Sequence, residues 1–315
     1  MANPPRGPGG GRMIVGVDIG GHHIAAAAVA NGGRGAILPE SYRHDPCAPD
    51  DDRDTLIAAW AGAIDAVIER VGPARVTGIG IAMPGPFDYA AGIGHFAGNA
   101  KFAALNGVDV GAALAAAQRF PRAVRFLNDA TAFAVGCVAI GAAPATDNVI
   151  GVTLGTGLGS AFLRRGGIPA IDGDDVPPHG SLWHLPFRGG IADDHVSARW
   201  LTARLRERLG SAATVVTGAQ AARAGDAHAA AIFAEYGAHL GTILSPWVAR
   251  FGAATVMLGG RICGAVDLFG PALGRALPAT GIAVHADTED AAIIGAAATF
   301  DPAFWDRARH HLPTR

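Results

Sequence analysis

The amino-acid sequence predicts an α/β fold divided into two lobes. The chain has 315 residues, which is more than one hydrophobic core usually serves. Apolar runs with the composition of strands alternate with segments of helical periodicity, a pattern typical of α/β domains with a largely parallel sheet. One strand-and-turn pattern occurs twice, which indicates an internal duplication. Together these observations favour two related lobes.

The first predicted strand follows a polar tail. Residues 1–12 are rich in Gly, Pro and Arg, so ordered structure should begin at Met13. The run MIVGVDIGG at 13–21 is largely apolar and ends in a glycine pair that suits a tight turn. We therefore expect a buried strand there and a second strand at 23–30, where the sequence reads HIAAAAVA.

A helix and two more strands are predicted before the middle of the chain. Residues 54–71 carry apolar side chains at helical spacing behind an aspartate that can cap the helix. Residues 76–83 (VTGIGIAM) form an apolar run that ends at a Pro-Gly-Pro break, and residues 123–127 (AVRFL) form another. The second run leads to Asn128 and Asp129, after which ATAFAVGCVAIG should form a helix.

The repeated pattern is VIGVTLGTG at 149–157. Aligned with the first copy, it places Gly151 on Gly16, Thr153 on Asp18 and Gly155 on Gly20. In each copy an apolar strand delivers a polar side chain and then glycines, whose backbone N–H groups can approach a phosphate closely. The pair predicts a nucleotide site, although each turn alone also suits an ordinary hairpin between core strands. Neither turn matches the P-loop pattern GxxxxGK[ST], and GTGLGS lacks the third glycine of a dinucleotide-binding turn.

Bulk composition argues against several classes of protein. Hydrophobic residues make up 50% of the chain, but no run of about 18 apolar residues is free of charge, Gly or Pro, so we expect no membrane span. A formal net charge of -2 provides no basic stripe for nucleic acid. The three cysteines form no CxxC pair and the N-terminus has no apolar leader, which favours a cytoplasmic protein.

Seven short motifs in order carry a family resemblance: DIGG, GIAMPGP, LNDATAFA, VTLGTGLGS, a G-x-x-x-H at 180–184, VMLGGR and IIGAA. In number, order and spacing they resemble the ROK family of sugar kinases and repressors across residues 13–300. The resemblance implies an ATP:sugar phosphotransferase that uses Mg²⁺ and forms homodimers in many members. It also implies a two-lobed actin-like ATPase (ribonuclease H-like) fold with duplicated mixed sheets, and a central cleft that holds sugar and ATP.

The resemblance also sets the expected domain boundaries. After the tail at 1–12, an N-terminal lobe should span 13–127 and a C-terminal lobe 128–294. The last segment, 295–315, should be a helix that returns to the N-terminal lobe.

The resemblance assigns nucleotide contacts to both glycine turns. Asp18, Gly20 and Gly21 would form the first phosphate loop, with His22 beside them, and Gly155, Thr156 and Gly157 the second. Gly259 and Gly260 would lie near the adenosine. Asp18 would organise the water shell of Mg²⁺, since magnesium takes few carboxylates and keeps several waters. The alternative for Asp18 is a turn residue at a strand end.

The implied sugar ligands are Asn99, Asn128, Asp129, Ser181, His184 and Asp193. Phosphoryl transfer needs a group that orients the attacking hydroxyl or accepts its proton, and Asp129 suits that role as general base. An aspartate between a strand and a helix is also a common helix N-cap. Asn99, in a Gly/Lys-flanked loop, could instead be a turn residue.

Two departures from the family pattern concern the phosphate loop and zinc. His22 stands where the family usually has a threonine, so an imidazole replaces a hydroxyl expected near the phosphates. The family's cysteine-rich zinc motif is absent from the stretch that follows Gly180. We expect no zinc site, although His179, His184, His195, Asp193 and Asp194 cluster there in sequence.

Further departures concern the acceptor. Ser181 replaces a family glutamate that binds sugar hydroxyls, Asp193 is a shorter substitute for a second, and Trp183 replaces a glycine. These changes favour a modified hexose, such as an amino sugar, a deoxy sugar or a cyclitol of secondary metabolism, phosphorylated on its primary (6-type) hydroxyl. An ordinary glucokinase and a non-catalytic sugar sensor are the alternatives. A repressor is disfavoured because residues 1–12 cannot hold a helix-turn-helix.

Overall fold

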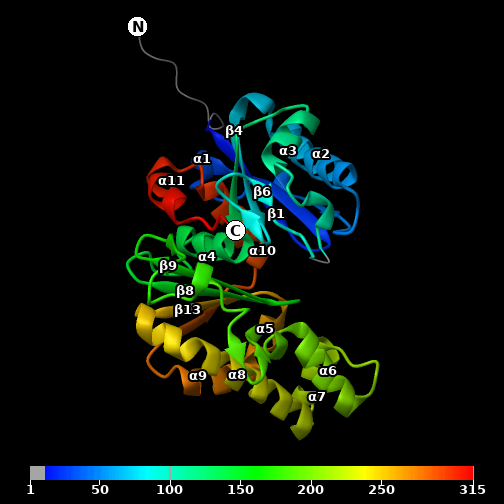
Figure 1. Cartoon of the computed structure of the whole chain (residues 1–315), viewed down its shortest axis with the longest axis vertical. Coiled ribbons are helices and arrows are strands. Elements are labelled where there is room, and N and C mark those ends of the chain that lie inside the picture. The colour runs from blue at the N-terminus through cyan, green and yellow to red at the C-terminus, as the bar shows by residue number, and fades with distance from the viewer. Residues whose placement is uncertain (1–10, 99–100, 315) are drawn as a thin grey trace. The chain divides into compact units, whose positions relative to one another are not determined.

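The computed structural model describes residues 11–98 and 101–314 and divides the chain into two compact units (Figure 1). Unit 1 comprises Met1–Ile140 and Glu289–Arg315, and unit 2 comprises Gly141–Thr288. The chain therefore leaves unit 1 once and re-enters it at Glu289. In the described part of the chain, no helix has both the length and the apolar character that a membrane span requires.

Unit 1 is built on a five-stranded mixed sheet with strand order β3-β2-β1-β4-β7. Its strands are β1 (Met13–Ile19), β2 (His23–Val29), β3 (Arg43–Pro46), β4 (Val76–Met83) and β7 (Val124–Asn128). β1, β2 and β3 are antiparallel neighbours, whereas β4 runs parallel to β1 and β7 runs parallel to β4. The four predicted strands are confirmed within two residues at each end, because apolar runs of this length are buried on both faces of the sheet.

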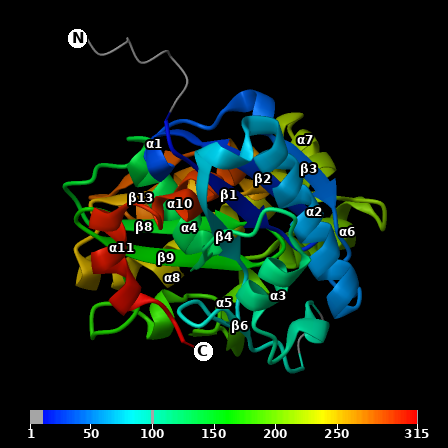
Figure 2. The ribbon, with the colours of Figure 1, turned by 90° about the horizontal axis from the view of Figure 1, so that it is seen from above.

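Helices cover both faces of this sheet. α2 (Arg53–Val71) joins the core that holds Val15 and Val17, whereas α10 (Thr288–Ala298) contributes Ile293 to the core on the other face, with Ile14. Figure 2 shows α2 beside the strands. The predicted helix at 54–71 is confirmed as α2, and its cap is Asp52, which accepts the N–H of Thr55 at 2.9 Å.

The remaining elements of unit 1 are short. They are α1 (Ala30–Gly33), α3 (Val110–Ala117), α4 (Asp129–Ala139), α11 (Pro302–Ala308), the hairpin of β5 (Phe87–Asp88) and β6 (Ile93–Gly94), and 3-10 turns at Pro39–Ser41, Pro73–Arg75, Ala103–Leu105 and Arg309–His311. Of these, α4 confirms the helix predicted after Asp129.

α4 and α10 cross each other at glycines. A Cβ atom on Gly136 of α4 would lie 1.8 Å from the carbonyl oxygen of Ala291, and one on Gly295 of α10 would lie 1.8 Å from that of Ala132. No side chain fits at such a distance, so the two helix backbones are in direct contact. Both helices belong to unit 1, whose bounds lie at 140/141 and 288/289, whereas lobe boundaries at 127/128 and 294/295 were expected. The sequence pattern alone does not reveal a helix crossing of this kind.

Unit 2 repeats the sheet of unit 1, with strand order β10-β9-β8-β13-β14. Its strands are β8 (Val149–Leu154), β9 (Leu158–Arg164), β10 (Ile168–Ala170), β13 (Thr255–Gly259) and β14 (Gly281–Val284). As in unit 1, three antiparallel strands are followed by two strands that run parallel to the first. The duplication expected from the two glycine turns is therefore present in the topology as well.

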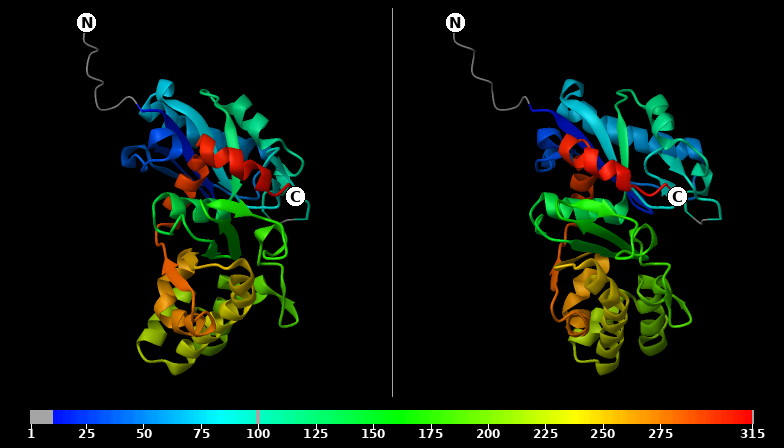
Figure 3. Two further views of the ribbon diagram at one scale, coloured as in Figure 1. Left: turned by 90° about the vertical axis from the view of Figure 1, so that its left-hand side faces the viewer. Right: turned by 60° about the vertical axis from the view of Figure 1, so that its left-hand side comes forward.

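The helices of unit 2 include one of 25 residues, α8 (Ala227–Phe251). The others are α5 (Ala192–His195), α6 (Ala198–Leu209), α7 (Val215–Arg223) and α9 (Val266–Ala276); β11 (Pro186–Phe187) pairs with β12 (Gly190–Ile191), and 3-10 turns lie at Pro178–Gly180 and Arg261–Ala265. Figure 3 shows α8 and α9 on one side of the sheet. They bury Ile150 and Val152 of β8 in the core of this unit.

Candidate active site

The first glycine turn joins β1 to β2 in unit 1. Asp18 is the penultimate residue of β1 and pairs in register with Ala25 on β2 and Ala82 on β4. The N–H of Gly20 donates to the carbonyl oxygen of His23 at 3.0 Å, which closes the turn. Asp18 is half-buried near the carboxyl end of β1, which lies at the same edge of the sheet as the carboxyl end of β7.

The glycines of this turn have close neighbours. A Cβ atom on Gly20 would lie 2.4 Å from Cε1 of His23, and one on Gly21 would lie 2.6 Å from Nζ of Lys101. A larger residue at either position would displace those side chains. His22 is exposed in the turn, and its carbonyl oxygen accepts the N–H of Cys47 at 3.0 Å.

Asn128 caps helix α4, and Asp129 follows it in the first turn. The Oδ1 of Asn128 accepts the N–H groups of Ala130 and Thr131 at 3.1 and 3.2 Å. Asp129 is half-buried, and its Oδ1 accepts the N–H of Ala130 at 2.8 Å. Asn128 therefore fills the capping role that was the alternative for Asp129, while the carboxylate of Asp129 interacts with the N–H of Ala130 and the side chain of Asn128.

Tyr89 is a residue of this site that the sequence did not predict. Its buried hydroxyl accepts the Nδ2 of Asn128 at 3.1 Å and donates to the carbonyl oxygen of Met83 at 3.0 Å. Both the nitrogen and the oxygen of the Asn128 side-chain amide thus have hydrogen-bond partners. A signal for Tyr89 was its position just after the Pro-Gly-Pro break that ends β4.

The carboxylates of Asp18 and Asp129 influence each other. The pKa of Asp18 is raised to about 7, mainly by burial and further by the charges of Asp129 and Glu289, against the lowering effect of His23. Burial also raises the pKa of Asp129, against the lowering effects of neighbouring N–H groups, Asn128 and the charge of Lys101. Such an excess of buried negative charge is typical of a site that receives a cation or a proton.

The second glycine turn joins β8 to β9 in unit 2. The N–H of Gly155 donates to the carbonyl oxygen of Gly157 at 3.1 Å, and the carbonyl oxygen of Gly155 accepts the N–H of Ala198 at 2.9 Å. Thr156 is exposed at the tip of the turn. The two turns occupy equivalent positions, after the first strand of each sheet.

Asp193 holds this second turn. Its Oδ1 accepts the N–H of Leu158 at 2.6 Å, and its Oδ2 pairs with Arg199 at 2.7 Å. A Cβ atom on Gly157 would lie 2.8 Å from the same Oδ1. Both oxygens of Asp193 thus have partners within unit 2, and its predicted sugar contact stays a prediction.

Ser181 and His184 lie in a segment that Ser160 anchors. The buried hydroxyl of Ser160 donates to the carbonyl oxygen of Gly180 at 3.0 Å and accepts the N–H of Leu182 at 2.9 Å. Ser181 and His184 are half-buried, and burial together with His179 lowers the pKa of His184. Ser160 was not predicted, although it is the serine that ends the GTGLGS motif.

Trp183 is 48% exposed, and its ring and that of His184 form a T-shaped contact with centroids 5.3 Å apart. His195 instead packs edge-on against Phe187 and His239 at 5.3 and 5.6 Å. Among residues 11–98 and 101–314, the histidines and aspartates of 179–195 provide no group of three converging metal ligands. His195 instead belongs to a cluster of aromatic rings with Phe187 and His239.

Gly259 and Gly260, the glycines expected near the adenosine, stand at the end of β13. Gly260 adopts φ of 90°, and its N–H donates to the hydroxyl of Thr288 at 2.7 Å. A Cβ atom there would lie 2.3 Å from the carbonyl oxygen of Leu154, so only glycine fits after Gly259.

Asn99 lies outside the residues that the structure describes, so its predicted sugar contact stays a prediction.

The chain resembles proteins of known name along most of its length. It is 27% identical over 280 residues to a glucokinase of Thermotoga maritima, a match that covers 82% of this chain and 85% of that protein. Among solved structures, a ROK hexokinase from Thermus thermophilus superposes with a TM-score of 0.75 at 24% identity, covering 93% of this chain and 99% of the other.

Two further structures show how widely the fold is used. A ROK family glucokinase from Streptomyces griseus, solved with glucose and AMPPNP, has a TM-score of 0.70 at 24% identity and covers 90% of this chain and 98% of the other. A ROK family transcriptional regulator, a homologue of the E. coli MLC protein, has a TM-score of 0.73 at 18% identity and covers 95% and 81%. The predicted α/β actin-like ATPase fold with two mixed sheets is confirmed.

The model of the ROK family matches residues 14–301. That range includes every motif on which the resemblance was based and nearly all of both units. The chain belongs to the ROK family.

Proposed function

We propose that this protein is an ATP-dependent sugar kinase in which Asp129 is the general base. The observation that carries the proposal is the placement of Asp129 in the first turn of α4, half-buried, with its pKa raised by burial, while Asn128 caps the helix. The names of the relatives, a glucokinase and a hexokinase, support the reaction class.

In this proposal Asp129 accepts the proton of the sugar hydroxyl as that oxygen attacks the γ-phosphoryl group. A base in contact with the attacking hydroxyl contributes about 10²- to 10⁴-fold to the rate. The glycine turns at 20–22 and 155–157 bind phosphates through backbone N–H groups. The AMPPNP in the Streptomyces griseus glucokinase supports ATP as the donor.

Asp18 fits a magnesium ion. Mg²⁺ prefers oxygen ligands and usually binds through one or two carboxylates while it keeps several waters. Asp18 is a half-buried carboxylate beside a glycine turn, and its pKa of about 7 reflects negative charge that a cation would balance. When bound, the ion would neutralise charge on the phosphates. Asp18 would hold its waters, and Lys101 would add positive charge next to Gly21.

For the acceptor, we propose a modified hexose, phosphorylated on its primary hydroxyl. Ser181 provides a hydroxyl where family members have a carboxylate, and the oxygens of Asp193 are engaged by Leu158 and Arg199. Relative to the family pattern, one carboxylate acceptor for ring hydroxyls is thus replaced by a hydroxyl, and a second is a shorter side chain that already binds an N–H group and a guanidinium. A charge-assisted hydrogen bond contributes about 1.5–3 kcal/mol, so glucose should lose roughly one to two decades in kcat/KM for each bond that is not replaced.

The test is a comparison of kcat/KM for glucose, mannose, N-acetylated hexosamines and free amino hexoses, with ADP release as the readout. We expect Mg²⁺- and acceptor-dependent turnover, with a modified hexose the best acceptor. Glucose as the best acceptor by tenfold would contradict the substrate class but leave the kinase intact. Sugar binding without ADP release would instead identify a sensor, a role compatible with the fold of the ROK transcriptional regulator.

A further inference from the structure

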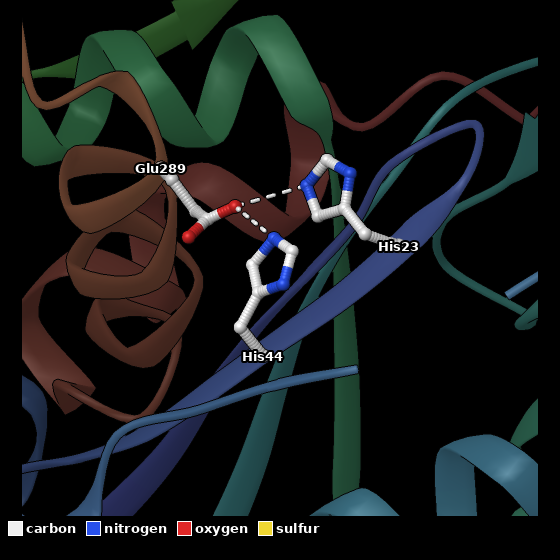
Figure 4. Close-up of side chains that lie close together, drawn as sticks. All are labelled: His23, His44 and Glu289. Carbon is white, nitrogen blue, oxygen red and sulfur yellow. Dashed lines mark ion pairs between the residues drawn. The ribbon is translucent and has the colours of Figure 1, made fainter. Parts of the chain in front are cut away.

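Three potential metal ligands converge in unit 1 from three segments far apart in the sequence. They are His23 at the start of β2, His44 on β3 and Glu289 in the first turn of α10. Figure 4 shows both imidazoles directed at the carboxylate of Glu289. Among the described residues, this is the single group of three His, Cys, Asp or Glu side chains whose ligand atoms all lie within 4.8 Å of one another.

The distances suit a metal ion. The Nε2 atoms of His23 and His44 lie 2.9 and 3.6 Å from the same oxygen, Oε2 of Glu289. Metal–nitrogen and metal–oxygen bonds of about 2.0–2.2 Å in tetrahedral geometry place neighbouring ligand atoms roughly 3.3–3.5 Å apart. The two nitrogen–oxygen distances lie on either side of that range, and all three ligand atoms lie within 4.8 Å of one another. The side chain of His44 is 52% exposed, which leaves room for its ring to turn toward an ion.

The carboxylate is already oriented and charged. The hydroxyl of Tyr42 donates to Oε1 of Glu289, which leaves Oε2 facing the two imidazoles. Burial raises the pKa of Glu289, but the hydrogen bonds from His23 and Tyr42 and the charges of both histidines outweigh this and lower it overall. Its position at the N-terminus of α10 favours the negative form too. A partner that fixes a ligating group in this way is a regular feature of metal sites.

The two imidazole rings lie face to face beside the carboxylate. The rings of His23 and His44 are stacked, with centroids 4.8 Å apart and planes inclined by 13°. Because the lone pair of an imidazole nitrogen lies in the plane of its ring, one ring must turn out of the stack before both nitrogens can bind one ion. A divalent cation would then accept a lone pair from each of the three groups.

We propose that His23, His44 and Glu289 form a binding site for a borderline first-row divalent cation such as Zn²⁺, separate from the magnesium proposed near Asp18. Two imidazoles and one carboxylate suit Zn²⁺, Co²⁺ or Ni²⁺, whereas Mg²⁺ prefers oxygen ligands alone. Three protein ligands leave at least one coordination position for water or another small ligand. The sequence predicted no zinc site because it lacks the family's cysteines, and this group uses none.

The site would link the first glycine turn to the point where the chain re-enters unit 1. The ring of His23 packs against Gly20, since a Cβ atom there would lie 2.4–2.9 Å from three of its atoms. Glu289 is the first residue of unit 1 after the excursion through unit 2. A bound ion therefore restrains both the turn and the start of α10.

The test uses the untagged full-length chain, stripped of metal with a chelator. Zn²⁺ binding is measured by isothermal titration calorimetry, and Co²⁺ binding by its visible absorption bands. We expect one ion per chain, unaffected by excess Mg²⁺. His44→Asn and Glu289→Gln should weaken binding by more than the roughly 10- to 100-fold that loss of an outer-shell partner costs, and Tyr42→Phe by about that amount.

Two variants serve as controls, and circular dichroism of the metal-free proteins shows that each is folded. His95→Asn removes another exposed histidine of unit 1, and His184→Asn removes one from the histidine-rich segment of unit 2. Both should bind Zn²⁺ as the unmodified chain does. The proposal is overturned if the unmodified chain shows no stoichiometric binding, if His44→Asn and Glu289→Gln bind normally, or if His184→Asn abolishes binding.

Discussion

The Oδ1 of Asp193 accepts the backbone N–H of Leu158 at 2.6 Å, directly after the second glycine turn. The carboxylate stands beside Gly157, close enough to exclude a Cβ atom there, and Arg199 occupies its other oxygen. Asp193 therefore orders a turn proposed to bind phosphate. Its substitution should affect the nucleotide more than the sugar.

For Asp193→Ala we expect the KM for ATP to rise roughly tenfold or more, with a smaller change in the KM for the sugar. The N–H of Leu158 would lose its acceptor, and an unsatisfied, part-buried donor costs about 1–3 kcal/mol. Steady-state kinetics with each substrate varied in turn provides the measurement. Arg199→Ala is the matched control, because its side chain is 68% exposed and such an ion pair contributes little. A rise confined to the sugar KM would instead support the predicted contact of Asp193 with the sugar.

Asp18→Asn should stabilise the ligand-free protein while it impairs turnover. The pKa of Asp18 is raised from 3.8 to about 7, so the folded state binds this proton more tightly than the unfolded state. Between these two values the free energy of unfolding falls as the pH rises, and it stays low above pH 7. Asparagine cannot ionise, so the variant should be more stable at pH 8 by on the order of 2 kcal/mol.

Urea unfolding at pH 5 and pH 8 measures this effect. The advantage of Asp18→Asn should be larger at pH 8, where the native carboxylate is ionised, than at pH 5. A variant that is less stable than the unmodified chain at pH 8 would mean that the charge of Asp18 is already compensated within the protein.

Two glycines in helix interiors should respond oppositely to alanine. Gly136→Ala should destabilise the protein by about 1–3 kcal/mol or more, because its Cβ atom would lie 1.8 Å from the carbonyl oxygen of Ala291 and force α4 and α10 apart. Gly62→Ala in α2 should stabilise it by roughly 0.5–1 kcal/mol, since nothing lies within 4 Å of the added atom. Thermal unfolding of both variants gives the comparison. Equal effects would contradict the close crossing of α4 and α10.

The sequence was most informative where one segment carries its own signal. The strands β1, β4 and β7 and the helix α2 were predictable because long apolar runs and helical spacing are local patterns. The duplicated turns were predictable because the same residues recur after two similar strands. By the same logic Asp18 and Asp129 stand out as polar residues at the ends of buried strands.

What the sequence did not reveal depends on contacts between distant segments. Tyr89 reaches Asn128 across 39 positions, and His23 meets Glu289 only because α10 packs on the sheet. The contact of Asp193 with Leu158 could not be predicted from sequence spacing, since Leu158 lies 35 residues earlier. The bounds of the two compact units differ from the expected lobe boundaries for the same reason, because the contact of α4 with α10 joins helices from either side of unit 2.

The central proposal, that Asp129 is the general base, is tested most directly by kcat of Asp129→Asn with Mg·ATP and the best acceptor from the sugar panel. We expect a loss of about three decades, within the 10²- to 10⁴-fold that a general base contributes, with an unchanged circular dichroism spectrum. Asp54→Asn makes the same change in the first turn of α2, where the side chain is exposed, and should keep full activity. A kcat for Asp129→Asn within tenfold of that of the unmodified protein would contradict the assignment.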